Sequence, residues 1–195
     1  MVVPPPHVSR MTIDKRSLRS ELRRLRRDFV ADGPPALVPP SLFLNALRKG
    51  MVVASYIPVG SEADPSRFEA AALYAGATLV WPIVVDRESP ITFHTAPGGG
   101  RMTEGPFGLR QPPGGSEPVV PDIILTPLLG FDSQCNRLGQ GAGHYDRAFA
   151  SWPEALRIGI AWSVQQVNEL PRDPWDMPLD AIVTETELIL PGAAG

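Results

Sequence analysis

The feature that most constrains this chain is a short apolar run that leads through a glycine-rich loop into a helix. Residues 123–125 are β-branched or apolar and lie between prolines, a pattern that predicts a short buried strand. Gly139, Gly141 and Gly143 alternate further on, and residues 144–152 have the composition of a helix. Because glycine tolerates positive φ and carries no Cβ, such a loop lets a ligand approach the backbone closely. The pattern predicts a binding loop between a strand and a helix.

The charges around this loop indicate which ligand it would take. Free N–H groups and the positive end of the dipole at a helix start favour phosphate, and Arg137 adds a cation. Asp146 would repel a polyphosphate unless a divalent cation such as Mg²⁺ lay between them. The loop therefore predicts a site for a nucleotide and magnesium. The alternative is a plain strand-to-helix connection, because the run matches neither G-x-x-x-x-G-K-[ST] nor G-x-G-x-x-G.

The N-terminal part predicts a basic amphipathic helix. It should run over residues 15–29 with Asp14 as its N-cap. Its apolar stripe consists of Leu18, Leu22, Leu25 and Phe29. Lys15 and Arg19 are four residues apart beside this stripe, so both can reach one anionic group at the domain surface. The alternative is a solvated basic face without a ligand.

The remaining pattern alternates strands and helices with short connections. The predicted elements after the first helix are a helix at 42–49 capped by Ser41, strands at 51–56, 78–81, 91–93, 156–162 and 179–183, a helix from Pro65 to Gly76, and a short helix or turn at 164–170. This order predicts an α/β fold with a mostly parallel sheet covered on both faces. The Gly- and Pro-rich passage 97–118 is too long for a plain connector, so we expect a binding loop there.

Composition limits the classes of protein that fit. A chain of 195 residues with 43% hydrophobic content can form one domain, which we expect at residues 12–195 after a disordered tail at 1–11. The net charge of −3 gives no general attraction to nucleic acid or anionic membranes, and we expect neither as a partner. The single cysteine, Cys135, excludes an internal disulfide and fits a reducing cytoplasm. We expect no signal peptide at the N-terminus, and the sequence has no uninterrupted apolar run of 18 residues.

At this point the motifs resemble a known family. The run GFDSQCNRLGQGAGHYD at residues 130–146 is similar to the signature of 5-formyltetrahydrofolate cyclo-ligases, also called methenyltetrahydrofolate synthetases. The likeness includes KRSLR at residues 15–19, YIP at 56–58 with Glu62, FGLRQP at 107–112, and Asp180. These matches occur in the same order from about residue 14 to residue 185.

The resemblance implies a fold and a reaction. The fold would be a single three-layer α/β domain similar to the NagB/RpiA/CoA-transferase-like fold. The reaction would be the ATP-dependent cyclisation of 5-formyltetrahydrofolate to 5,10-methenyltetrahydrofolate, with ATP and Mg²⁺ as cofactors and a reduced folate as the small-molecule substrate. We expect a cytoplasmic monomer.

The resemblance also assigns roles to individual residues. Arg137 and Tyr145 would be catalytic, and Asp146 and Asp180 would hold Mg²⁺. The residues that would bind ATP are Lys15, Arg19, Arg137, Leu138, Gly139, Gln140, Gly141, Ala142, Gly143, His144 and Tyr145. The residues that would bind the folate are Val59, Glu62, Phe107, Gln140, Gly141, Ala142, Gly143 and His144.

Several of these residues have simpler explanations. Glu62 would ordinarily be a solvated loop carboxylate, and Asp180 a solvated strand end. Phe107 would either stack on the pterin ring or anchor its loop to the core.

The motif departs from common family forms at Cys135, Gln140, Ala142 and His144. Gln140 and His144 would face the folate. We therefore expect these two departures to affect the choice of folate substrate more than the use of ATP. Two competing functions are a non-catalytic folate- or nucleotide-binding member, and an enzyme of the same fold that handles phosphosugars or acyl-CoA.

Overall fold

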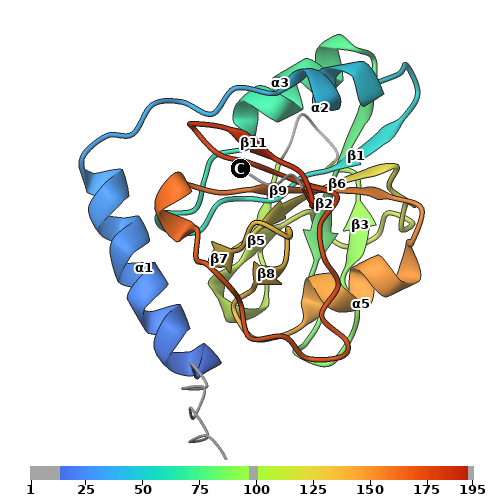
Figure 1. Cartoon of the computed structure of the whole chain (residues 1–195). Coiled ribbons are helices and arrows are strands. Elements are labelled where there is room, and N and C mark those ends of the chain that lie inside the picture. Colours follow the sequence, from blue (N-terminus) through green and yellow to red (C-terminus); the bar gives the residue numbers. More distant parts are fainter. Residues whose placement is uncertain (1–13, 97–100, 193–195) are drawn as a thin grey trace, which may run out of the picture.

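A seven-stranded sheet crosses the centre of the computed structural model, which describes residues 14–96 and 101–192 (Figure 1). Its strands, in spatial order, are β11 (Leu188–Ile189), β10 (Ala181–Val183), β9 (Leu156–Ile160), β6 (Ile123–Pro127), β1 (Val52–Ala54), β2 (Thr78–Ile83) and β3 (Thr92–His94). The five central strands are parallel, and the edge strands β3 and β11 are antiparallel to their neighbours. The prediction of a mostly parallel sheet is confirmed.

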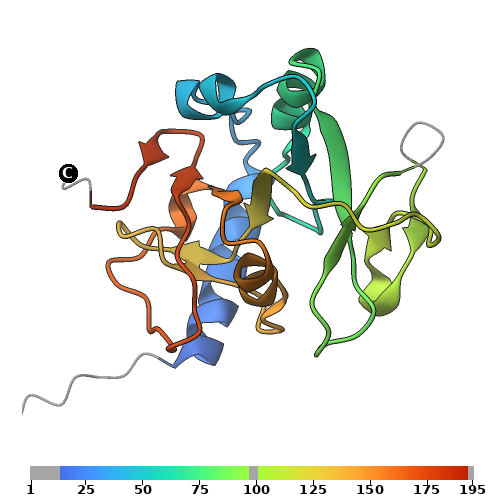
Figure 2. The same ribbon diagram turned by 90° about the vertical axis from the view of Figure 1, so that its right-hand side faces the viewer.

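Helices cover both faces of the sheet (Figures 1 and 2). Helices α2 (Ser41–Ala46) and α3 (Ser66–Tyr74) lie on one face, and α5 (His144–Ser151) lies on the other. Strand β6 shows why both faces are apolar, because alternate side chains point to opposite sides of a strand. Ile123 and Leu125 pack in the cluster under α2 and α3, whereas Ile124 packs in the cluster under α5. The structure confirms the three-layer α/β prediction, and the specific fold name stays a prediction.

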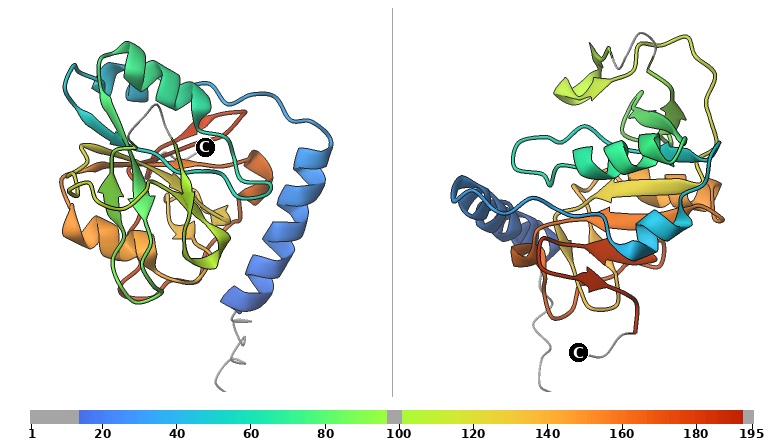
Figure 3. Two further views of the ribbon diagram at one scale, coloured as in Figure 1. Left: turned by 180° about the vertical axis from the view of Figure 1, so that it is seen from behind. Right: turned by 90° about the horizontal axis from the view of Figure 1, so that it is seen from above.

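Helix α1 (Lys15–Ala31) lies along one side of the sheet, joined to the rest by an extended segment at residues 33–40 (Figure 3). Asp14 caps it, as predicted, by accepting hydrogen bonds from the N–H groups of the next turn. Leu18 and Leu22 are buried against two leucines from the second half of the chain. A Cβ on Gly130 would lie 2.5 Å from Leu22 Cδ1, so this glycine permits the close approach of the helix.

Several predicted boundaries are wrong. The helix predicted from Pro65 to Gly76 is Ser66–Tyr74, with Pro65 at the N-cap position rather than inside the helix. The strand predicted at residues 123–125 continues to Pro127, which pairs with Ile160 of β9. The helix predicted at residues 42–49 ends at Ala46, because Leu47 is extended with ψ of 137°, and Ser41 lies inside the helix rather than capping it.

Short hairpins account for segments that were expected to be loops. Strands β7 (Gly130–Phe131) and β8 (Arg137–Leu138) pair between β6 and the glycine loop. In the long Gly- and Pro-rich passage, β4 (Thr103–Glu104) pairs with β5 (Arg110–Gln111), with the 3₁₀ turn η1 (Pro106–Gly108) between them. A second 3₁₀ turn, η2 (Ser163–Gln165), packs against α1. The predicted disordered tail at residues 1–11 lies outside the described residues.

Candidate active site

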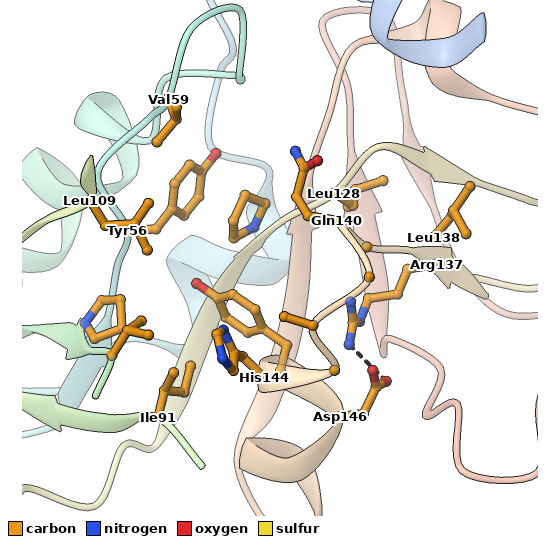
Figure 4. A pocket seen from close by; sticks show the side chains of 18 of the residues that line it. Tyr56, Val59, Ile91, Leu109, Leu128, Arg137, Leu138, Gln140, His144 and Asp146 are labelled. Carbon is orange, nitrogen blue, oxygen red and sulfur yellow. Dashed lines mark ion pairs between the residues drawn. The ribbon is translucent and has the colours of Figure 1, made fainter. Parts of the chain in front are cut away.

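A pocket opens where the parallel strands β1, β2 and β6 end, the edge at which open α/β sheets hold ligands (Figure 4). Its volume of about 640 Å³ falls within the range of small-molecule sites, roughly 300–1,000 Å³. All predicted ATP and folate residues line it: Lys15, Arg19, Val59, Glu62, Phe107, Arg137, Leu138, Gly139, Gln140, Gly141, Ala142, Gly143, His144 and Tyr145. Segments far apart in the sequence therefore form one site.

The glycine loop has the backbone geometry that its sequence indicates. Gly141 has φ of +107° and Gly143 has φ of +69°, so both occupy conformations that side-chain-bearing residues rarely adopt. Gly143 is the residue just before α5. Arg19 Nε donates a hydrogen bond of 2.9 Å to the carbonyl oxygen of Gly139. This contact joins α1 to the loop.

Arg137 is a fixed cation at the base of the loop. Its side chain is 5% exposed, and its Nη2 lies 2.7 Å from Asp146 Oδ1. Its guanidinium carbon lies 5.8 Å from the ring centre of Tyr145 and 5.2 Å from that of Phe149. Arg137 Nε is buried and has no hydrogen-bond partner among the described residues. A buried, unused donor beside a glycine loop favours an anionic ligand.

Lys15, the first residue of α1, lines the pocket. Its Nζ lies 2.6 Å from Asp173 Oδ2 and 2.7 Å from Asp176 Oδ2. Burial by itself would lower the pKa of Lys15, but hydrogen bonds from its ammonium to the two carboxylates raise it above its usual value. Sequence reasoning missed both aspartates, because nothing in the pattern places them beside a lysine 158 and 161 residues away.

Glu62 is not the solvated carboxylate that its loop position suggested. Its side chain is 9% exposed, and Oε1 lies 3.8 Å from Nη1 of the buried Arg26. The amide of Gln140 donates to Oε1 at 3.3 Å, and the backbone N–H of Val59 donates to Oε2 at 3.0 Å. Glu62 thus joins the loop after β1, helix α1 and the glycine loop. The sequence pattern assigned no role to Arg26, because its partner Glu62 is 36 residues away and meets it only in the fold.

The aromatic residues of the pocket differ in exposure. Phe107 is 58% exposed and has φ of +61°, so it does not anchor its loop in the core. The guanidinium carbon of Arg87 lies 5.5 Å from its ring centre. Burial, followed by the charge of Glu62, raises the pKa of Tyr145, so its phenol stays neutral at physiological pH. A neutral phenol can donate a hydrogen bond to an anion.

His144 and Arg147 connect the glycine loop to the turn that follows β2. His144 Nε2 donates a hydrogen bond of 2.9 Å to the carbonyl oxygen of Asp86. Arg147 Nη2 donates to the carbonyl oxygens of Arg87 at 2.8 Å and Ala142 at 2.9 Å. Burial lowers the pKa of His144, so the neutral ring is favoured. These contacts fix one wall of the pocket.

The two predicted magnesium ligands lie in different places. Asp146 lines the pocket beside Arg137 (Figure 4). Asp180 is not among the residues that line it, and Arg157 holds the Asp180 carboxylate through Nη2 at 2.8 Å and its backbone N–H at 2.8 Å. Asp180 immediately precedes β10, and the start of a parallel strand lies at the sheet edge opposite the pocket. The structure does not bring Asp146 and Asp180 together at this pocket.

Comparison with known proteins gives consistent matches. The model of the 5-formyltetrahydrofolate cyclo-ligase family matches residues 11–185. A Haemophilus influenzae protein named 5-formyltetrahydrofolate cyclo-ligase is 27% identical over 187 residues, covering 86% of this chain and 96% of the relative. A Mycolicibacterium smegmatis protein of the same name is 31% identical over 154 residues, covering 73% of this chain and 78% of the relative.

A solved structure is similar over nearly the whole chain. The NMR structure of the Aquifex aeolicus 5,10-methenyltetrahydrofolate synthetase superposes with a TM-score of 0.65 and 28% sequence identity. The similarity covers 93% of this chain and 94% of that one.

Proposed function

Because the chain belongs to the 5-formyltetrahydrofolate cyclo-ligase family, we propose that the pocket beside the glycine loop is the active site for this family's reaction. The enzyme catalyses the ATP-dependent cyclisation of 5-formyltetrahydrofolate to 5,10-methenyltetrahydrofolate, with release of ADP and phosphate. The location of the active site rests on one observation. Residues from α1, from the loop after β1 and from the glycine loop line the same pocket.

The chemistry requires activation of a poor electrophile. The N5-formyl group resembles an amide, so its oxygen is a bad leaving group. Transfer of the γ-phosphoryl group of ATP to this oxygen breaks the bond to ADP and forms a phosphorylated intermediate. The folate N10 then attacks the formyl carbon and loses its proton, the ring closes, and the C–O bond breaks to release phosphate. Positioning and neutralisation of charge are the main contributions of the protein in such a transfer.

We assign the phosphate groups to the cationic side of the pocket. Arg137 is the catalytic cation, because its buried Nε is available and its orientation is fixed by Asp146 and two rings. The loop amides, Lys15 and Arg19 bind the remaining phosphate oxygens. The neutral phenol of Tyr145 donates to the transferred phosphoryl group as its charge develops.

We assign the folate to the other side of the pocket. Figure 4 shows Val59 and Leu109 across the cavity from Arg137 and Asp146. Val59 provides an apolar contact, and the exposed ring of Phe107 provides a flat surface for the folate. Glu62, held by Arg26 and Gln140, accepts hydrogen bonds from the pterin.

We propose that Mg²⁺ is bound with the nucleotide. Magnesium is usually held by one or two carboxylates together with substrate phosphates, and Asp146 offers a carboxylate beside the glycine loop. Asp176 is the second candidate because it lines the same pocket, and Asp180 stays a prediction from the family resemblance. The ion would neutralise charge on the transferring phosphoryl group. Among the described residues, no cluster of three or more His, Cys, Asp or Glu side chains is arranged to hold a metal.

One assay tests the proposed site directly. The parent protein should produce the absorbance of the methenyl product from 5-formyltetrahydrofolate when ATP and Mg²⁺ are present, and none without ATP. Arg137→Gln should reduce kcat by roughly 100-fold or more, because it removes a preorganised cation from the developing charge. A parent rate that needs no ATP, or a fully active Arg137→Gln, would refute the assignment.

We propose further that the enzyme acts as a cytoplasmic monomer without nucleic acid or membrane partners. The net charge of −3 and the single cysteine support this proposal. No helix in the described part of the chain is both long and apolar enough to cross a bilayer. Sedimentation at micromolar concentration should give a single species of about 21.1 kDa, and a dimer mass would overturn the proposed monomer.

A further inference from the structure

An exposed tryptophan lies at the edge of the pocket, on the side where Lys15 enters. Trp175 lines the cavity and is 68% exposed. It belongs to none of the apolar clusters formed by the described residues, and it has no ring contact among them. Exposing so much aromatic surface to water is unfavourable. Trp175 therefore presents an uncovered aromatic ring to a ligand in the pocket.

A rigid turn presents this side chain. The backbone N–H of Asp176 donates to the carbonyl oxygen of Asp173 at 3.0 Å, which closes a four-residue β-turn. Pro174 and Trp175 are its central residues, and proline is favoured at the first of these positions. The Asp176 carboxylate accepts from the Asp173 N–H at 2.8 Å. The backbone of Trp175 is thus fixed before any ligand arrives.

The same turn is attached to the phosphate-binding side of the pocket. Lys15 Nζ donates to the carboxylates of both Asp173 and Asp176, so one ammonium group spans the turn. Burial alone would raise the pKa of Asp176, but the Asp173 N–H and Lys15 hold it below its usual value. The turn carrying Trp175 therefore lies directly beside a cation that we assign to the phosphates of ATP.

Other aromatic side chains of the pocket are less suited to a second flat ligand. Tyr56 is buried, and its hydroxyl donates to the carbonyl oxygen of Ala63. Tyr145 packs against Phe149 and Arg137. Phe107 lies two residues before Leu109, which Figure 4 places across the cavity from Arg137 and Asp146. Trp175 is left on the nucleotide side.

We propose that Trp175 is the platform on which the adenine ring of ATP stacks. The proposal rests on the proposed function to the extent that the pocket must bind ATP. A purine offers a large π-face, and stacking of a base on an aromatic side chain is favourable for every base. Stacking acts on the base alone, whereas Lys15, Arg19 and Arg137 act on the phosphates. The two contributions are therefore separable by choice of ligand.

Calorimetric binding of ATP and of inorganic tripolyphosphate, both with Mg²⁺, separates them. Trp175→Ala should weaken ATP binding by about tenfold and leave tripolyphosphate binding unchanged, since only ATP carries a base. Trp175→Phe should retain most of the ATP affinity, because it keeps a stacking ring. Tyr74→Ala is the matched control: Tyr74 is 97% exposed, lies outside the pocket lining, and should leave both affinities unchanged.

Two results would overturn the stacking role. Equal weakening of ATP and tripolyphosphate by Trp175→Ala would show that the residue only supports the turn that orients Lys15. Unchanged ATP binding in Trp175→Ala would place the base elsewhere. This binding measurement does not depend on turnover. If the parent protein formed no methenyl product, the proposed function would be refuted. A selective loss of ATP affinity in Trp175→Ala would still support the stacking role of Trp175.

Discussion

At the scale of single residues, the ion pair between Arg137 and Asp146 is central to the site. The 2.7 Å contact orients the arginine, and the carboxylate lines the pocket, where we have proposed that it binds Mg²⁺. Asp146→Asn should weaken Mg·ATP binding by roughly tenfold or more, because a neutral amide is a poor ligand for Mg²⁺. Titration calorimetry measures this, with circular dichroism to confirm an intact fold.

Asp180→Asn provides the comparison for that experiment. Because Arg157 holds Asp180 away from the pocket lining, this substitution should leave Mg·ATP affinity close to that of the parent. An unchanged affinity in Asp146→Asn would remove Asp146 from the metal site. A large loss in Asp180→Asn would restore the assignment that the family resemblance suggested.

Cys135 provides a second prediction at this scale. The side chain is fully buried, and burial raises the pKa of its thiol to about 11. Since the thiolate is the reactive form, the folded protein should resist alkylation by iodoacetamide at pH 8 and react promptly in urea. Mass spectrometry of the labelled protein measures both rates. Rapid labelling under native conditions would mean that the β7–β8 hairpin opens readily.

Prediction at the residue scale succeeded where the signal is local. The cap at Asp14 and the positive φ of Gly141 and Gly143 follow from residue types within a few positions. Arg26, Asp173 and Asp176 could not be found in this way. Their roles depend on partners that are far away in the sequence and meet only after folding, such as Asp173 and Lys15.

At the scale of elements, helix α1 contributes side chains to the pocket and to the residues that support it. Arg19 donates a hydrogen bond to the glycine loop, Lys15 lines the same pocket, and Arg26 pairs with Glu62. The helix docks closely because Gly130 leaves room for Leu22. The position of α1 therefore affects both halves of the site.

Gly130→Ala should disturb this docking. The added methyl group would lie 2.5 Å from Leu22 Cδ1, and such overpacking typically destabilises a protein by about 1–3 kcal/mol. Urea unfolding measures the loss, and the KM for ATP should rise as Lys15 and Arg19 move with the helix. Gly114→Ala is the control, since a Cβ there meets no atom within 4 Å. Equal stability of the two variants would show that α1 adjusts without loss.

The buried pair of Arg26 and Glu62 gives another prediction for the same helix. Removing one partner of a buried ion pair typically costs about 3–5 kcal/mol, so Arg26→Met should strongly reduce the free energy of unfolding. Adding Glu62→Gln should recover part of that loss, because the unpaired charge disappears. Denaturant unfolding of the single and double variants measures the coupling, and strictly additive losses would show that the two side chains do not interact.

Long periodic elements were predictable, whereas short ones were not. The stripe of α1 and the apolar runs of β6 and β9 specify their structures locally. Strands β7 and β8 have two residues each, too few for any periodicity, and form because they pair with each other. The early end of α2 and the antiparallel edges β3 and β11 likewise depend on tertiary contacts.

At the scale of the whole molecule, the parallel sheet determines where chemistry occurs. The C-terminal ends of β1, β2 and β6 meet at one edge, and α1 and the glycine loop close the space beyond them. This topology explains why Glu62 belongs to the pocket and Asp180 does not. Figure 2 shows the β4–β5 hairpin on the side of the molecule away from β11, beyond strand β3.

In the proposed reaction, this pocket brings the formyl oxygen of the folate to the γ-phosphoryl group of ATP. The most direct measurement is the fate of an ¹⁸O label placed in the formyl group of 5-formyltetrahydrofolate and followed by mass spectrometry of the released phosphate. If the phosphoryl group is transferred to that oxygen, each phosphate should carry one ¹⁸O atom, in step with formation of methenyltetrahydrofolate. Unlabelled phosphate, with the label lost to water, would contradict the account.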